Sequence, residues 1–490
     1  MKKRLVIYFH YDPRGQADEA CRFAVRAVLG QAQAVFFVTN GRLDAESRAW
    51  AQSAGVRLLE RENAGFDVGA YQAALNCLGR AALDAYDEIV LMNYTLAGPV
   101  RPLGAMFAAM DARADLDFWG LSRHYAMRSR RFGGRRGAVP EHLQSHFIAV
   151  RRPMYDAFWQ YWQAMEPPQS YEDSVARHET RFTAHFAGLG FRWDSFLDGE
   201  RWRGVFVNPL MACPQQLIAA EGCPFFKRRS FFTPWADELR RTDGLAARRL
   251  YDWLKAEGTY PVDALLRALL PAQPLADLAR NLHWHFLLPA AGAGQAVEPL
   301  TPQQLAGGAA LDAQKFYFLP LPLPETQPAR YYAQAAVWDA AQRQAAAALL
   351  ERQPLLGIVG PALPLYPGCV QGRLRRWRRE APAVRAAAQA LGLSVPLTAD
   401  APPLPCGCAV VRGAAFPHGL PPLRTPADAW LLPLAAQQQG WGAATAEDAA
   451  QALARADLQP VLQLALSWPQ AAKSCVRAAK HALLAKEDTE

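Results

Sequence analysis

The chain has 490 residues, 51% of them hydrophobic, and a formal net charge of +8. This length exceeds what one hydrophobic core organises, so we expect two or three domains. The apolar content and the 14 Trp exclude a disordered protein. The eight Cys lack CxxC spacing, which indicates free thiols in a reducing compartment and no zinc site. No run approaches the roughly 18 apolar residues that span a bilayer, and we interpret the short apolar run near Met1 as a strand, not a signal peptide.

The first 235 residues alternate apolar segments with amphipathic ones. We predict strands at 4–9, 34–39, 56–60, 87–92, 117–121 and 145–151, and helices at 17–30, 44–54, 70–83 and 102–111. This order predicts an α/β fold with a mostly parallel sheet that helices cover on both faces. In such sheets ligands bind beyond the carboxyl ends of the strands.

Residues 60–72, ERENAGFDVGAYQ, are the most informative segment and predict a turn from a strand into a helix. Gly65 and Gly69 permit positive φ or close backbone approach. Asp67 can cap a helix that starts near Ala70, and the exposed N–H groups there favour an anionic group. An ordinary strand-to-helix turn with a capping Asp explains the same residues equally well.

The chain changes character after residue 235. We expect a mainly helical segment at 236–290 and a linker at 291–311. Further strands are predicted at 314–322, 355–360 and 406–412, with a helix at 330–352 and mainly helix from 425 onward. The predicted domains are therefore 1–235, 236–311, 312–424 and 425–490.

Two stretches of the second half resemble two of the first half. DFWGLSRHY at 117–125 compares with PLLGIVGPALPLY at 354–366, and SHFIAVRRPMYDAF at 145–158 compares with CGCAVVRGAAF at 406–416. Each pair places a strand, a Gly, a loop and then a strand that ends in Arg. Chance similarity in an Ala- and Arg-rich chain is the alternative. A true repeat lacks a counterpart of the 61–69 turn, so its second copy is a scaffold or an acceptor-side domain.

The positive charge is concentrated in three clusters, at 128–136, 227–229 and 373–379. No helix-turn-helix, zinc finger or RNP-type motif accompanies them, so we do not expect nucleic acid as a partner. A sugar nucleotide, a lipid diphosphate or an anionic membrane surface uses the same charges. The basic amphipathic segment 470–487 either lies on an anionic leaflet or packs on its own domain.

Six stretches of the first half resemble, in order, the rhamnan synthesis protein F family. They are YFHYDPRG at 8–15, RENAGFDVGAY at 61–71, YDEIVLMNYTLAGP at 86–99, DFWGLS at 117–122, HLQSHFIAVRR at 142–152 and PFFKRRSFF at 224–232. The similarity is looser after residue 235. It implies a GT-A-like (Rossmann-like) glycosyltransferase domain with a helical linker and a second, smaller α/β domain. It further implies rhamnose transfer from dTDP-rhamnose or GDP-rhamnose to a lipid-linked polysaccharide, at the cytoplasmic side of the membrane.

The resemblance implies donor-binding roles for residues at the strand ends. Asp12 can accept hydrogen bonds from the base or ribose, or it caps the following turn. Asn63 and Asp67 face the nucleotide in this architecture, and Arg61 pairs with a phosphate or with Asp67. Lys227 and Arg228 are candidates for the diphosphate, although solvated loop charge is the alternative.

Residues 93–95 lie where a GT-A fold places its Asp-x-Asp metal motif. Asn93-Tyr94-Thr95 lacks the acidic residue that related chains have, and Mg²⁺ prefers anionic oxygen ligands. Asn93 and Thr95 then contact the donor, with Asn93 the single candidate ligand for Mg²⁺ or Mn²⁺. Two alternatives stay open: a metal-independent enzyme with Arg or Lys neutralising the diphosphate, or impaired activity.

An inverting transfer needs a base that takes the proton of the acceptor hydroxyl. Glu179 precedes Gly190 and Phe191 by the spacing that GT-A enzymes show, so it is the candidate base; stabilisation of its own helix is the alternative. His142, Gln144 and Ser145 are candidates to hold donor or acceptor hydroxyls. The prediction is an inverting glycosyltransferase of cell-surface polysaccharide assembly, and the alternative is a catalytically weak scaffold or acceptor-binding relative.

Overall fold

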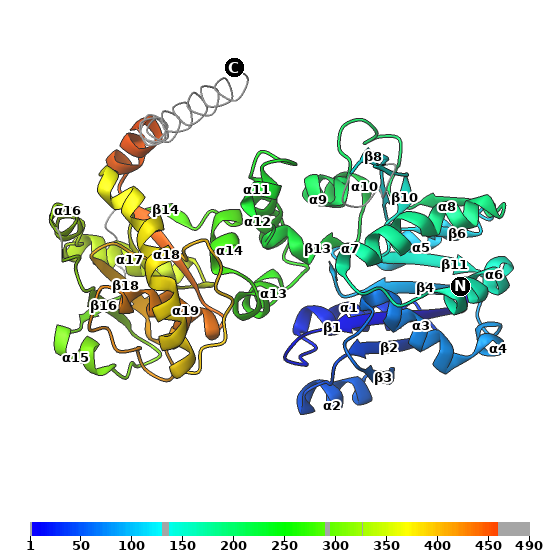
Figure 1. The fold of residues 1–490 in the computed structure, drawn as a ribbon, viewed down its shortest axis with the longest axis horizontal. Coiled ribbons are helices and arrows are strands. Elements are labelled where there is room, and N and C mark those ends of the chain that lie inside the picture. Colours follow the sequence, from blue (N-terminus) through cyan, green and yellow to red (C-terminus); the bar gives the residue numbers. More distant parts are fainter. Residues whose placement is uncertain (1, 130–136, 290–294, 326, 459–490) are drawn as a thin grey trace, which may run out of the picture. The chain divides into compact units, whose positions relative to one another are not determined.

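A computed structural model describes residues 2–129, 137–289, 295–325 and 327–458 of the chain. It consists of two compact units, Met1–Leu265 and Leu266–Glu490 (Figure 1). Each unit is built around its own sheet, and each is described by itself. Among the described residues, no helix combines the length and the apolar character needed to cross a membrane.

The first unit contains a seven-stranded sheet in the order β12-β6-β11-β4-β1-β2-β3. Its strands are β1 (Arg4–Tyr11), β2 (Ala34–Asn40), β3 (Arg57–Arg61), β4 (Glu88–Asn93), β6 (Phe118–Gly120), β11 (Phe147–Arg151) and β12 (Trp193–Ser195). All neighbouring strands are parallel except that β11 runs antiparallel to both β4 and β6. The predicted α/β class with a mostly parallel sheet is confirmed.

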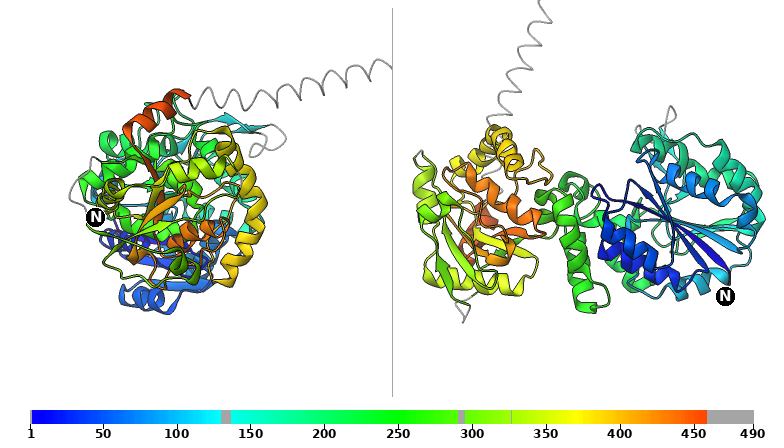
Figure 2. Two further views of the ribbon diagram at one scale, coloured as in Figure 1. Left: turned by 90° about the vertical axis from the view of Figure 1, so that its left-hand side faces the viewer. Right: turned by 90° about the horizontal axis from the view of Figure 1, so that it is seen from below.

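Helices cover both faces of this sheet (Figure 2). They are α1 (Glu19–Leu29), α2 (Ala45–Ser53), α3 (Phe66–Leu78), α4 (Arg80–Leu83), α5 (Leu103–Asp111), α6 (Tyr155–Ala164), α7 (Tyr171–Ser174) and α8 (Thr180–Gly188). Leu5, Ile7 and Phe9 of β1 pack with α3, α6 and α8, while the alternate residues Val6 and Tyr8 are buried on the other face. Because both faces are buried, the strands are almost continuously apolar.

The start of α3 differs from the prediction. The helix begins at Phe66 instead of near Ala70, and its N-cap residue is Gly65 with φ 68°. No side chain caps it, so the capping role predicted for Asp67 is wrong; Asp67 lies in the first turn. Gly79, with φ 78°, then separates α3 from α4, where the sequence predicted one helix.

Short ribbons extend the edges of the first unit. β5 (Leu96–Ala97) pairs with β13 (Phe226–Lys227), β7 (Arg123–His124) pairs with β10 (His142–Leu143), and β8 (Met127–Arg128) pairs with β9 (Ala138–Val139). The helices that follow are α9 (Pro209–Ala212), α10 (Pro214–Glu221), α11 (Trp235–Glu238), α12 (Ala246–Glu257) and α13 (Val262–Leu269). Two-residue strands carry no periodic pattern, and for this reason the sequence did not predict them.

A buried ion network joins the amino ends of β1 and β4 to the carboxyl end of β11 and to β6. Glu88 accepts hydrogen bonds from Arg4 Nε at 2.7 Å, from Arg151 Nε at 3.3 Å and from Trp119 Nε1 at 2.9 Å. The Glu88 side chain is 0% exposed and that of Arg4 is 1% exposed. Removal of one partner therefore leaves buried charge without compensation.

We expect Glu88→Gln to lower the free energy of unfolding of the first unit by about 3 kcal/mol, because the buried guanidinium groups of its partners lose their counter-charge. Differential scanning calorimetry of the full chain measures this change. Glu19→Gln is the matched control, since its ion pair with Arg26 is exposed and exposed pairs contribute little. Equal effects of the two variants would contradict a special role for the buried network.

The second unit contains a six-stranded sheet in the order β14-β19-β17-β18-β16-β15. Its strands are β14 (His285–Leu287), β15 (Val297–Pro299), β16 (Phe316–Pro320), β17 (Leu356–Pro361), β18 (Cys408–Arg412) and β19 (Gly442–Glu447). Its helices are α14 (Leu275–Asn281), α15 (Pro302–Gly307), α16 (Ala329–Ala335), α17 (Ala340–Arg352), α18 (Pro367–Ala390) and α19 (Leu431–Gln438). The basic segment 470–487 lies outside the described residues.

Three strands of this sheet occur where the sequence indicated helix or linker. β14 and β15 lie within 236–311, and β19 lies after residue 425. Residues 442–447, Gly-Ala-Ala-Thr-Ala-Glu, lack the branched apolar run of a typical buried strand. Pairing with β17 and β14 on its two sides makes this segment a central strand nonetheless.

Five strands of the second sheet repeat the arrangement of five strands of the first. In chain order, β15, β16, β17, β18 and β19 correspond to β1, β4, β6, β11 and β12, and both sets have the same spatial order. In both sets the fourth strand is antiparallel to its two neighbours. The similarity that the sequence indicated between 117–158 and 354–416 is thus also a similarity of strand topology.

The Arg at the end of each antiparallel strand has the same contact in both units. Arg151 Nη2 donates to the carbonyl of Met110 in α5 at 2.6 Å, and Arg412 Nη2 donates to that of Leu350 in α17 at 2.5 Å. Each Arg therefore binds a carbonyl near the carboxyl end of the helix that precedes the neighbouring strand. This shared contact gives the repeated strand-Arg pattern a physical cause.

Candidate functional site

Residues from the ends of β3 and β4 meet at the carboxyl edge of the first sheet. Asn93, the last residue of β4, is 5% exposed, and its Nδ2 donates to Asp67 Oδ2 at 3.3 Å. Ser174 at the end of α7 lies at the other oxygen, with its hydroxyl 3.5 Å from Asp67 Oδ1. Burial raises the pKa of Asp67 to about 6, and the negative charge of Glu179 adds to this effect.

The turn before Asp67 is held in an unusual conformation. Gly65 and Phe66 both have positive φ, 68° and 52°, which is uncommon for an aromatic residue. A Cβ at Gly69 would lie 2.9 Å from the Ala64 carbonyl oxygen, so the close packing there requires glycine. Arg61 Nη1 donates to Asn40 Oδ1 at 2.6 Å and to the Ala64 carbonyl at 2.7 Å. Arg61 therefore binds the turn itself instead of Asp67.

Thr95 connects the end of β4 to a basic residue far along the chain. Its hydroxyl donates to Asn93 Oδ1 at 2.5 Å and accepts from Lys227 Nζ at 3.2 Å. Burial lowers the pKa of Lys227 to about 8, against the carboxylates of Glu179 and Asp67, which raise it. The neighbouring Arg228 has a different partner from Lys227, because its guanidinium pairs with Asp18, the N-cap residue of α1.

Glu179 lies in a π-helical turn, Val175–Glu179, between α7 and α8. Single π-helical turns within α-helices are frequent at functional sites. Ser145 donates its hydroxyl to Glu179 Oε2 at 2.5 Å, and His142 Nε2 lies 3.6 Å from Oε1. Burial raises the pKa of Glu179, but the contacts with His142 and Ser145 and the charge of Lys227 outweigh it and hold the pKa below its ordinary range.

The hydrogen bonds of His142 determine where its proton lies. Its Nδ1 is 2.7 Å from the Pro140 carbonyl, which can only accept, so Nδ1 carries hydrogen. In the neutral ring, Nε2 would then present a lone pair to the Glu179 carboxylate. The two groups are 3.6 Å apart, which is longer than a hydrogen bond, so their contact is electrostatic and favours the ionised Glu179 carboxylate when the ring is charged. His124 stacks on His142 with ring centroids 5.2 Å apart.

The other predicted residues lie farther from this pair or support it. Gln144 accepts a hydrogen bond from Ser122 at 2.8 Å and is 5% exposed, so it braces the strand entry. Asp12 accepts from the backbone of Arg14 and Gln16 and thereby shapes the loop after β1. Asn63 is exposed at the turn and contacts Asn40 at 3.4 Å. The cluster at 128–136 lies mostly outside the described residues.

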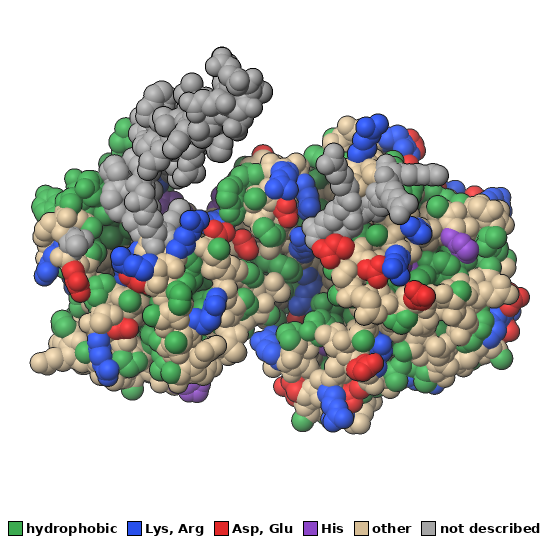
Figure 3. Space-filling view, in the orientation of Figure 1, with side chains coloured by type: hydrophobic (Ala, Val, Ile, Leu, Met, Phe, Trp, Pro, Cys, Tyr) green, Lys and Arg blue, Asp and Glu red, His purple; other side chains and the backbone are tan. Residues whose placement is uncertain are grey.

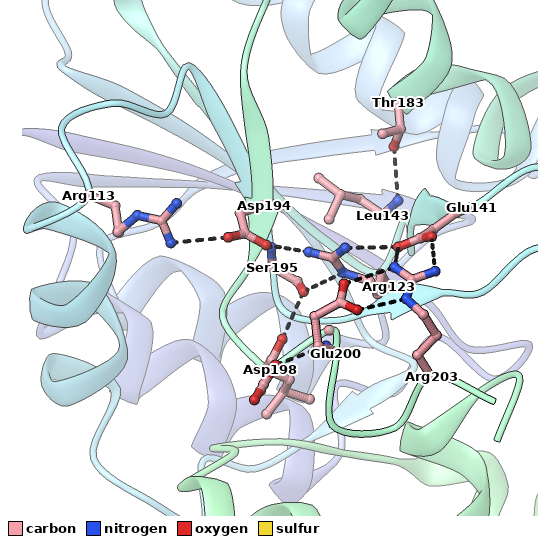
Figure 4. A network of polar contacts seen from close by, with 12 residues as sticks. Arg113, Arg123, Glu141, Leu143, Thr183, Asp194, Ser195, Asp198, Glu200 and Arg203 are labelled. Atoms are coloured by element: carbon pink, nitrogen blue, oxygen red, sulfur yellow. Dashed lines mark hydrogen bonds and ion pairs between the residues drawn. The ribbon is translucent and has the colours of Figure 1, made fainter. Parts of the chain in front are cut away.

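An ion network fixes the ribbon that carries His142 (Figure 4). Arg123 of β7 pairs with Glu141, next to His142, at 2.8 Å and also with Asp194, the middle residue of β12. Arg203 binds the same Glu141 at 2.9 Å and Glu200 at 2.9 Å. Acidic and basic groups alternate through this network, so it holds the β7–β10 ribbon to the sheet without adding net charge to the site.

The pairing of basic with acidic groups extends over the surface. On the face drawn in Figure 3, Lys and Arg side chains lie among Asp and Glu side chains. The Arg residues at 48, 80 and 113 have acidic partners within 3.2 Å. The basic residues in these pairs are already neutralised by protein carboxylates.

The residues at the end of β4 do not fit Mg²⁺ or Mn²⁺. These ions take oxygen ligands that include carboxylates, and Mg²⁺ requires near-octahedral geometry. Asn93 Oδ1 already accepts two hydrogen bonds, from the Thr95 hydroxyl and the Thr95 N–H. The ammonium of Lys227 lies on the same Thr95 and repels a second cation. Within the described part of the chain, no group of three or more His, Cys, Asp or Glu is placed to hold a metal ion.

The structure thus brings together Asp67, Asn93, Thr95, Lys227, Glu179, His142 and Ser145. Two further residues at the site were absent from the sequence prediction. Ser174 gives no signal beyond its position near Glu179, and His124 pairs with His142 only through the β7–β10 ribbon. The strand entry HLQS was the available signal for His142, and no pattern in the sequence indicated that His124 lies beside it.

We expect Asp67→Asn to be more stable than the natural chain by up to about 2 kcal/mol at neutral pH, because it removes a poorly solvated carboxylate. The folded pKa of Asp67 is raised from 3.8 to about 6, so its proton stabilises the fold below about pH 4. This contribution is lost as the pH rises through about 6, where the folded protein also gives up the proton.

Thermal unfolding of the two proteins across this pH range measures the difference, which should shrink toward acid pH. Asp156→Asn serves as the control, because Asp156 is 83% exposed in its ion pair with Arg80. A difference between Asp67→Asn and the natural chain that does not vary with pH would contradict the raised pKa.

The strand order and the polar cluster at its carboxyl edge define a GT-A-like α/β domain. The family model of rhamnan synthesis protein F matches residues 35–304. The chain belongs to the rhamnan synthesis protein F family. No curated protein gives a significant match.

Solved structures show weak likenesses to part of the chain. Glucosyl-3-phosphoglycerate synthase from Mycobacterium tuberculosis is 14% identical over 31% of this chain and 58% of its own, with a TM-score of 0.22. Mannosyltransferase PcManGT from Pyrobaculum calidifontis, solved with GDP-Man and Mn²⁺, is 13% identical over 40% and 54%, with a TM-score of 0.28. This chain thus covers less than two thirds of either structure. At such scores, the fold assignment rests on the family and the strand order.

Proposed function

We propose that this protein is an inverting glycosyltransferase that moves rhamnose from dTDP-rhamnose or GDP-rhamnose to a lipid-linked, growing cell-surface polysaccharide. The observation that carries the proposal is the convergence of Asp67, Asn93 and Glu179 at the carboxyl edge of the first sheet. Family membership supports the chemistry of a sugar transfer. We place the reaction at the cytoplasmic face of the membrane, where lipid-linked precursors are extended.

In this proposal the donor lies across the ends of β1 and β4. Asp67 and Asn93 contact the nucleotide and ribose, and Asn63 with Arg61 shapes the turn that receives it. Lys227 lies at the diphosphate, and the positive end of the α3 dipole favours the anionic group there. His142 and Ser145 keep the Glu179 carboxylate oriented toward the sugar.

The transfer is a single displacement. The acceptor hydroxyl oxygen forms a bond to the anomeric carbon, the bond from that carbon to the diphosphate oxygen breaks, and the diphosphate leaves with the electron pair. Glu179 takes the acceptor proton as general base. A carboxylate with a low pKa is a weak base, but the negative diphosphate brought near it raises that pKa. Donor binding therefore makes Glu179 a stronger base.

We expect Glu179→Gln to lower kcat by at least about 100-fold, because it removes the general base but keeps the hydrogen bond from Ser145. The assay measures nucleoside diphosphate released from dTDP-rhamnose or GDP-rhamnose in the presence of a lipid-linked glycan. Glu172→Gln is the matched control, since Glu172 lies on the same helical segment and should leave kcat unchanged.

The outcomes separate the proposal from its rival. An unchanged kcat in Glu179→Gln would remove this residue from the reaction. Binding of a nucleotide sugar without turnover of any donor would instead favour a scaffold or acceptor-binding relative, which the neutral Asn93 also suits. Binding of neither nucleotide nor nucleotide sugar would contradict both.

A further inference from the structure

Lys227 lies at the site without an ion-pair partner among the residues that the structure describes. Its ammonium group donates a hydrogen bond to the Thr95 hydroxyl at 3.2 Å. For the residues whose placement is described, no Asp or Glu forms an ion pair with it, whereas its neighbour Arg228 is paired with Asp18. A partly buried ammonium group has three donors and favours an anionic partner.

Thr95 and, through it, Asn93 are the hydrogen-bonding groups next to Lys227, and the carboxylates of Glu179 and Asp67 raise its pKa without forming an ion pair with it. A divalent-cation site needs anionic oxygen ligands, but the end of β4 presents the amide of Asn93, the hydroxyl of Thr95 and the ammonium of Lys227. Such groups bind phosphate oxygens directly. With the pKa of Lys227 lowered to about 8, the group still carries its charge at neutral pH.

We infer that Lys227, held at Thr95, binds the diphosphate of the nucleotide donor directly and takes the place of a divalent cation. This inference rests on the proposed function and deepens it, because it identifies what receives the leaving group. When the bond between the anomeric carbon and the diphosphate oxygen breaks, the electron pair stays on that oxygen. The ammonium of Lys227 hydrogen-bonds to the diphosphate and stabilises the added charge.

The position of Lys227 in the fold supports this role. Lys227 lies in β13, whose pairing with β5 runs directly beside the Asn93–Thr95 segment. The backbone N–H of Arg228 donates to the Thr95 carbonyl at 2.9 Å, and the Arg228–Asp18 pair anchors the same segment to the start of α1. The backbone of Lys227 is therefore held in place by a paired strand. A residue held in this way loses little conformational entropy when it binds its ligand.

Isothermal titration calorimetry of the full chain with dTDP, GDP and UDP tests the inference. Each nucleotide is titrated once with EDTA and once with MgCl₂ or MnCl₂. We expect the tightest-binding nucleotide to have the same affinity in both conditions, within about twofold. Lys227→Met should weaken that nucleotide by about 10- to 100-fold, since it removes a charge-assisted hydrogen bond, while leaving the corresponding nucleoside unaffected.

Two variants control for charge and folding. Lys227→Arg keeps the positive charge and should retain most of the affinity in EDTA. Lys255→Met removes an exposed lysine that pairs with Asp263, and should change nothing. Thermal unfolding of each variant verifies that it folds, and the metal independence of the natural chain tests the inference without any variant.

Each remaining result has a defined meaning. Nucleotide binding that requires Mg²⁺ or Mn²⁺ would overturn the inference and leave the proposed transfer standing. Metal-independent binding that Lys227→Met does not weaken would overturn the role of Lys227 alone. Absence of nucleotide binding in both conditions would overturn the proposed function together with the inference.

Discussion

The reversed direction of β11 is the constraint on which the site depends. Because β11 runs antiparallel to β4, its amino end lies beside the carboxyl end of β4, and the Asn93 N–H donates to the His146 carbonyl at 3.1 Å. A parallel strand at this position would place residues 142–146 at the opposite edge of the sheet. The reversal therefore puts His142 and Ser145 at the same edge as Asp67 and Asn93, where Glu179 reaches them from the helical segment behind.

The two halves of the site differ in their electrostatic character. On one side, His142 and Ser145 surround Glu179 and keep it ionised. On the other, Thr95 links the neutral Asn93 to the charged Lys227. Asp67 accepts a hydrogen bond from Asn93 and has a raised pKa, so its charge is sensitive to the ligand that arrives there. The charges of Glu179 and Lys227 act on each other, since each shifts the other's pKa toward the charged form.

The sequence predicted the large elements of the first unit because its strands are apolar runs such as Leu5–Phe9 and its helices have clear apolar faces. It predicted Asp67 and Asn93 as neighbours because carboxyl ends of parallel strands meet at one edge. It did not predict that Lys227 and its neighbour Arg228 have different partners. Lys227 ends β13 and Arg228 begins a 3₁₀ turn, and a two-residue strand is too short to be recognised from the sequence. The sequence did not predict β19, because the small residues of Gly442–Glu447 form a strand only through pairing on both sides.

The long separation between Thr95 and Lys227, 132 residues along the chain, has a consequence for synthesis. During translation, the turn at Asp67 and the strand ending in Asn93 leave the ribosome well before the segment that carries the ammonium group. A growing polypeptide that has not reached β13 can form the inner strands but has no cation at Thr95. The contact between Thr95 and Lys227 forms only when β13 pairs with β5, so a fragment of this unit that ends before β13 lacks the cation that we propose for the leaving group.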